Sequence, residues 1–105
     1  MADIDVLENL AKRRPDDPRP RFGLAAEYEK RGDWARTVEH LRAYLRMTDD
    51  QGNAYGRLGR ALRQLGEEEE AIEAYRKGIA AARRHNHPTL AEEFEEVIRD
   101  MTGLP

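Results

Sequence analysis

Apolar residues recur along most of this chain at intervals of three and four, with charged residues between them. This spacing gathers apolar side chains on one face of an α-helix, whereas a half-buried strand would alternate apolar and polar positions. The clearest stripe in the first half is Val38, Leu41, Tyr44 and Leu45. The pattern therefore predicts an all-α fold of about six helices and no strand.

The chain also repeats itself. Segment 24–32 aligns without a gap on segment 58–66, an offset of 66 − 32 = 34 residues, and both segments end in glycine. The same offset pairs Val38 with Ile72, Leu41 with Tyr75, Tyr44 with Gly78, and Leu45 with Ile79. A fixed period of this length is the signature of a repeat architecture, in which each unit needs its neighbours to bury its apolar face.

Each unit has the pattern of a helix, a turn and a second helix. Gly32 and Gly66 are predicted to end the first helices, because glycine adopts a positive φ at little cost. Asp33 is predicted to cap the second helix of the first unit.

The packing positions of the second unit are Tyr55, Leu58, Gly59, Leu62, Gly66, Ala71, Tyr75 and Gly78. In these positions the chain resembles the tetratricopeptide repeat family, in the form of a small stand-alone protein of bacterial type. The resemblance covers residues 3–85 and implies a right-handed α-solenoid of helix hairpins. The first unit departs from the family pattern, since Arg21 replaces a large apolar residue and Thr37 replaces alanine.

The register predicts one domain over residues 1–105, built as a half repeat, two full repeats and a C-terminal capping helix. These segments are residues 3–17, 18–51, 52–85 and 88–102. Leu7, Leu10 and Pro15 occupy the places of a second helix and its terminal proline. The capping helix is predicted to start at a Thr89–Glu92 capping box after Pro88 and to end at Gly103. The buried apolar face of this helix would consist of Leu90, Phe94, Val97, Ile98 and Met101.

Composition narrows the possible functions. The 105 residues carry a net charge of −3, which disfavours nucleic-acid binding, and they include neither cysteine nor serine. No catalytic motif or phosphate loop is present, so no enzyme and no cofactor are predicted.

His85 and His87, with His40, could chelate a metal, but two close histidines equally suit a polar turn, and no metal site is predicted. The N-terminus lacks a secretory pattern and no apolar run could span a bilayer, so we expect a cytoplasmic protein without membrane contact.

The family resemblance implies a concave groove lined by the first helix of each hairpin. In this register the groove would present Arg19, Phe22, Gly23, Ala26, Lys30, Asn53, Gly56, Arg57, Arg60 and Gln64, with Arg63 at its edge. Guanidinium groups bind carboxylates in two-pronged fashion, so an acidic segment or a free C-terminus of a partner protein is the expected ligand. Alternatively, these arginines pair with Glu27, Glu29 or the acidic capping helix. Phe22, Ala26 and Arg57 replace the Lys and Asn of a chaperone-tail clamp, which excludes that function.

Two functional hypotheses remain. In the first, the protein is an adaptor that holds a partner peptide or protein in its groove. In the second, it associates with itself, and the homo-oligomer is the working unit. Exposure of Phe22 and Trp34 would favour the second hypothesis. An enzyme or a nucleic-acid-binding protein would need a convergent polar cluster or a basic stripe, and neither is found in the sequence.

Overall fold

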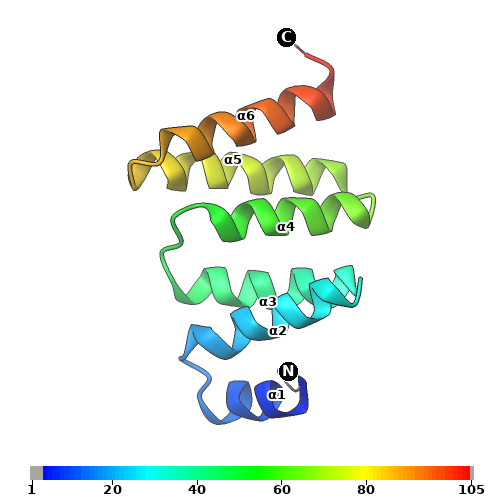
Figure 1. The fold of residues 1–105 in the computed structure, drawn as a ribbon, viewed down its shortest axis with the longest axis vertical. Helices are drawn as coiled ribbons and strands as arrows, with labels where there is room; N and C mark the ends of the chain where they lie inside the picture. The colour runs from blue at the N-terminus through cyan, green and yellow to red at the C-terminus, as the bar shows by residue number, and fades with distance from the viewer. Residues whose placement is uncertain (1–3, 105) are drawn as a thin grey trace. The chain divides into compact units, whose positions relative to one another are not determined.

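A computed structural model describes residues 4–104, which form helices and short turns without a strand (Figure 1). The helices are α1 (Ile4–Arg13), α2 (Pro18–Lys30), α3 (Trp34–Met47), α4 (Asn53–Gln64), α5 (Glu68–Arg84) and α6 (Pro88–Thr102). The predicted all-α fold with six helices is therefore confirmed. Residue 3, where the predicted half repeat begins, lies outside the described residues, as do both ends of the predicted domain.

The chain divides into two compact units, residues 1–49 and residues 50–105. The first unit contains α1, α2 and α3, and the second contains α4, α5 and α6. The division falls close to the repeat boundary expected between residues 51 and 52. The assignment of all repeats to one domain stays a prediction.

The core of the first unit lies where α2 packs against both α3 and α1. Leu24 and Leu41 are fully buried there. Thr37, which replaces the usual alanine, is also fully buried, and its hydroxyl donates a 2.8 Å hydrogen bond to the backbone oxygen of Asp33. Because the hydroxyl is satisfied within its own helix turn, threonine fits the site without leaving an unpaired polar group.

The turns follow the predicted chemistry. Gly32 and Gly66 follow the C-cap residues of α2 and α4 and adopt φ values of +71° and +78°. The side chain of Asp33 accepts a 3.2 Å hydrogen bond from the backbone N–H of Arg36 and so caps α3. Both expectations are confirmed.

The predicted capping box at the start of α6 is wrong. The helix begins at Pro88, His87 is its N-cap residue, and no side chain makes a cap hydrogen bond. Proline at the first helical position has a suitable φ and no N–H to leave unpaired, so it starts the helix one residue before Thr89. Thr89 therefore lies inside the first turn. The predicted end at Gly103 is confirmed, with φ +68°.

Aromatic rings fill glycine sites in the core of the second unit. The ring of Tyr75 lies against Gly59, and the ring of Phe94 on α6 lies against Gly56 and Gly78. The Tyr75 and Phe94 ring centroids are 5.5 Å apart. Phe94 is buried, and the other predicted residues of the α6 stripe are partly buried, while the acidic side is mostly exposed.

These contacts correct the prediction for Gly56. A Cβ atom at Gly56 would lie 2.6 Å from Cζ of Phe94, so this glycine faces α6 and is not an open groove wall. The sequence register could not reveal this, because the position at which a helix receives its neighbour depends on the packing angle between helices.

Candidate functional site

The four site residues predicted in the second repeat lie along one face of α4. Asn53, Arg57, Arg60 and Gln64 are spaced by four, three and four residues, which brings them into one stripe, here called the α4 stripe. Arg57 is half-buried and the other three side chains are exposed. The structure thus places these four residues together, while their role in binding stays a prediction.

The C-terminal half of the α4 stripe carries the positive charge of Arg60. Arg60 forms no ion pair with any residue in the described range 4–104. Burial raises the pKa of Tyr75, and the nearby Arg63 and Arg60 guanidinium groups offset part of that rise. Tyr75 therefore stays a neutral phenol at physiological pH, and it cannot neutralise these arginines.

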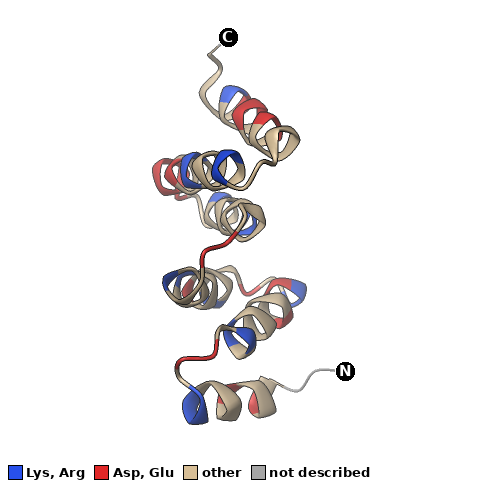
Figure 2. Cartoon of the chain, turned by 90° about the vertical axis from the view of Figure 1, so that its left-hand side faces the viewer, with Lys and Arg blue, Asp and Glu red and all other residues tan. Residues whose placement is uncertain are grey.

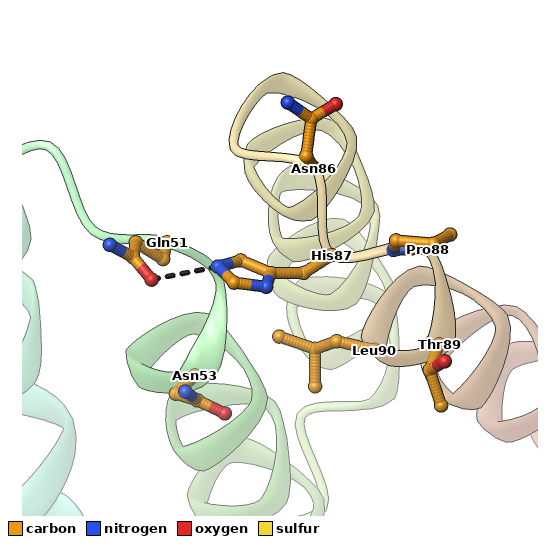
Figure 3. Close-up of a pocket in the computed structure, with 7 residues that line it drawn as sticks. All are labelled: Gln51, Asn53, Asn86, His87, Pro88, Thr89 and Leu90. Carbon is orange, nitrogen blue, oxygen red and sulfur yellow. Dashed lines mark hydrogen bonds between the residues drawn. The ribbon is translucent and has the colours of Figure 1, made fainter.

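An open pocket of about 450 Å³ adjoins the other end of the stripe (Figure 3). It is lined by Gln51, Asn53, Asn86, His87, Pro88, Thr89 and Leu90, none of which is acidic or carries a permanent positive charge. Between two of these residues, Nε2 of His87 and Oε1 of Gln51 form a 2.8 Å hydrogen bond, drawn as a dashed line in Figure 3. Side-chain amides both donate and accept hydrogen bonds, so this pocket suits a peptide backbone.

Sequence reasoning found Asn53 but missed the rest of this pocket. The loop residues Gln51 and Asn86 carry no motif, and only the three-dimensional turns bring them together. Asn86 adopts φ +61° after α5, a conformation that asparagine tolerates better than most residues. An asparagine between two predicted helices was the available signal for this turn.

The site residues predicted in the first repeat lie on α2, within the other unit. Arg19 pairs with Asp17 at 2.7 Å, and Lys30 pairs with Glu27 at 3.3 Å. Hydrogen bonds from Arg19 lower the pKa of Asp17 to about 2, so this pair persists at neutral pH. The alternative expectation, that the groove arginines pair with Glu27, Glu29 or the acidic capping helix, stays a prediction.

The apolar members of the predicted α2 site also have neighbours. The Phe22 ring lies 4.9 Å from the Tyr44 ring, centroid to centroid, and Phe22 is 36% exposed. Gly23 faces Leu7 of α1, since a Cβ atom there would lie 3.3 Å from Cδ2 of Leu7. Gly23 is therefore not an open wall either. Whether α2 and α4 line one groove stays a prediction.

A polar cluster in the first unit was not predicted. Arg21 donates through Nη1 to Nδ1 of His40 at 3.1 Å, and the His40 ring stacks on Tyr28 with centroids 5.5 Å apart. The Tyr28 hydroxyl donates to Glu8 at 2.9 Å, and the Arg36 guanidinium lies over the Tyr28 ring. A cavity of about 240 Å³ adjoins the cluster.

The cluster explains why the first unit departs from the family pattern at Arg21. In the second unit, 34 residues later, Tyr55 and Ala74 replace the Arg21–His40 pair. Arg21 can occupy a place usually taken by a large apolar residue because His40, which is only 6% exposed, accepts its hydrogen bond. The two substitutions are coupled and could not be interpreted one at a time.

We expect the first unit to lose stability as the pH falls below about 6.5, the pKa of an unfolded histidine, toward the lowered pKa of His40. Burial lowers the pKa of His40 below that of an unfolded histidine, about 6.5, and the Arg21 and Arg36 charges lower it further, while Glu39 and Glu8 oppose them. Between the two pKa values the unfolded chain binds the proton and the folded chain does not. The free energy of unfolding therefore decreases as the pH decreases, by at most about 1.4 kcal/mol per pH unit for one proton.

Fluorescence of Trp34, the single tryptophan, reports urea unfolding of this unit. A double variant that copies the second unit, Arg21→Tyr with His40→Ala, should unfold with little pH dependence over the same range. An equally steep pH dependence in this variant would show that His40 is not the responsible group.

Other classes of site find little support in residues 4–104. Within that range, no group of three or more His, Asp or Glu side chains is placed to hold a metal ion. In the same part of the chain, no helix is both long and apolar enough to cross a bilayer.

Comparisons with known proteins agree with this fold. A family model described as tetratricopeptide repeat matches residues 52–85, the span predicted for the second full repeat. The solution structure of a Bordetella parapertussis protein is similar to this chain at a TM-score of 0.77 and 25% sequence identity. The match covers 97% of this chain and 89% of that one. Residues 52–85 of this chain therefore match the tetratricopeptide repeat, and they lie within a six-helix fold that is similar to the fold of the Bordetella protein.

Proposed function

We propose that this protein is an adaptor that binds an acidic segment or a free C-terminus of a partner protein along the α4 stripe. Tetratricopeptide repeats generally mediate protein–protein interactions. The observation that carries the finer proposal is the stripe itself, two arginines and two amides on one helix face that ends in an uncharged polar pocket. In this proposal the protein acts in the cytoplasm as a binding module, without a catalytic residue or cofactor of its own.

A comparison of α4 with α6 supports a polar ligand for this face. The residues 34 positions after Arg57, Arg60 and Gln64 are Ala91, Phe94 and Ile98. On α6 those positions are apolar, and Ala91 and Phe94 are buried against their own unit. The same face of α4 carries guanidinium and amide groups, which would lose hydration against an apolar surface and gain hydrogen bonds from carboxylates.

The two parts of the site suit different parts of a peptide. Arg57 and Arg60 are one helix turn apart, so each can take a carboxylate of an acidic segment in two-pronged fashion. The pocket beside Asn53 offers amide groups and the Thr89 hydroxyl for peptide N–H and C=O groups. An extended acidic peptide running along α4 could use both parts.

Peptide binding with a charge-reversal variant tests the proposal. We expect labelled acidic peptides, with free or amidated C-termini, to bind the wild type and to lose at least about tenfold in affinity to Arg57→Glu with Arg60→Glu. Loss of even one charge-assisted hydrogen bond of about 1.5–3 kcal/mol gives this factor. Fluorescence anisotropy measures the affinity, and circular dichroism verifies that the variant is folded.

A matched control makes the same charge change elsewhere. Arg76 and Lys77 are exposed on α5, so Arg76→Glu with Lys77→Glu alters net charge equally without touching α4. At about 0.15 M salt, where distant charges are largely screened, the control should bind the peptides with wild-type affinity. Equal losses in both variants, or no binding by the wild type, would contradict the proposal. Affinity capture from lysate with the same three proteins then identifies the partner.

A further inference from the structure

The order of helices leaves a different type of helix at each end of the described chain. By repeat register α1 is the second helix of a hairpin, and it packs mainly on α2. α6 follows a complete hairpin, as a first helix does, and packs mainly on α5. Like the first helices α2 and α4, α6 is followed by a glycine of positive φ. We infer that α6 of one copy docks against α1 of a second copy, and that the two helices form a composite hairpin between molecules.

The outer side of α1 carries apolar residues bordered by cations. Val6 is 53% exposed, and Leu10, one turn further on, is partly exposed. Arg13 and Arg14 continue this line and are exposed. A cavity of about 310 Å³, lined by Leu7, Leu10, Arg14, Asp17, Arg19 and Pro20, lies beside it and could receive an apolar side chain.

The outer side of α6 carries apolar residues bordered by carboxylates. Val97 and Met101 are partly exposed and one turn apart, and Leu104, just past the helix, is 66% exposed. Glu93 and Glu96, both exposed, lie on the N-terminal side of this stripe. Figure 2 shows the acidic residues of α6 in red and the cationic end of α1 in blue.

The two faces match in antiparallel order, the order of the helices within a hairpin. Glu93, Val97 and Met101 are each four residues apart, as are Arg14, Leu10 and Val6 in reverse. Antiparallel docking would therefore set carboxylate against guanidinium at one end and apolar against apolar along the rest. The contact joins two different surfaces, so copies would associate head to tail. This contact is separate from the α4 stripe and does not depend on the proposed function.

Complementary charge reversal tests the inference. One variant carries Arg13→Glu with Arg14→Glu, and the other carries Glu93→Lys with Glu96→Lys. We expect the wild-type weight-average mass to rise above 12.1 kDa between about 10 µM and about 1 mM at low salt, measured by sedimentation or light scattering. Each variant alone should stay monomeric, because it faces like charges. An equimolar mixture should associate again, because each variant then meets opposite charges.

Each readout can overturn the inference. A wild type that stays at 12.1 kDa over the whole range means that no such contact forms. Variants that associate as well as the wild type place any self-association elsewhere on the molecule. A mixture that associates no better than either variant alone means that the charges do not meet. Circular dichroism of both variants verifies that lost association does not reflect unfolding.

Discussion

Replacement of Phe94 by alanine should lower the free energy of unfolding of the second unit by about 3–5 kcal/mol, the usual cost of removing a large buried aromatic side chain. Phe94 is buried, and its ring fills the space left by the missing side chains of Gly56 and Gly78 while contacting Tyr75. Since two of these neighbours are glycines, no side chain at those positions can move into the cavity. The loss should therefore lie near the upper end of the range.

Phe22 provides a matched control, because it is the other phenylalanine of the chain and is 36% exposed. Phe22→Ala should cost about 1 kcal/mol, close to the value of one aromatic pair. Urea unfolding followed by far-ultraviolet circular dichroism reports helices of both units, while Trp34 fluorescence reports the first unit. A Phe94→Ala variant that loses less than Phe22→Ala would contradict the packing described for α6.

Much of the fold could be predicted because its signals are local in the chain. The 34-residue offset indicated the hairpins, Gly32 and Gly66 indicated the turns, and Asp33 indicated the start of α3. Each of these features depends on backbone chemistry within a few residues, where one side chain or one φ value decides the outcome. The N-cap of α6 was wrongly predicted because two local signals competed, and Pro88 prevailed over the capping box at Thr89.

The features that could not be predicted involve residues far apart in sequence. The register assigned Gly56 to a groove wall, but its neighbour is Phe94, whose position depends on how α6 crosses the preceding hairpin. Arg21 looked like a defect of the repeat, because its partner His40 lies on another helix. Pairs of this kind appear in sequence only when the two repeats are compared position by position.

The candidate site shows the same limit. Periodicity placed Asn53, Arg57, Arg60 and Gln64 on one face of α4, since that relation lies within one helix. The pocket beside Asn53 needs the loop before α4 and the turn after α5, and only folding brings these two segments together. The ion pair of Arg19 with Asp17, by contrast, is local, because Asp17 is the N-cap residue of α2 and Arg19 lies two residues later.

The contact between Gly59 and Tyr75 gives the second large expected effect. A Cβ atom at Gly59 would lie 2.6–2.9 Å from three atoms of the Tyr75 ring, so Gly59→Ala forces the ring to move. Overpacking of this kind costs about 1–3 kcal/mol, against a gain of about 1 kcal/mol in helix propensity. Tyr75→Leu alone should also destabilise, because it leaves the site beside glycine underfilled.

The first unit shows how the pair can be repacked, since Ala25 and Leu41 occupy the same register positions 34 residues earlier and are both fully buried. The double variant Gly59→Ala with Tyr75→Leu copies that pair. We therefore expect its loss in free energy of unfolding to be smaller than the sum of the losses of the two single variants, by about 1–3 kcal/mol. Urea unfolding followed by circular dichroism on the four proteins of the cycle measures this coupling. A coupling near zero would mean that the ring and the glycine do not share one site, and that the volume match between the two repeats has no energetic basis.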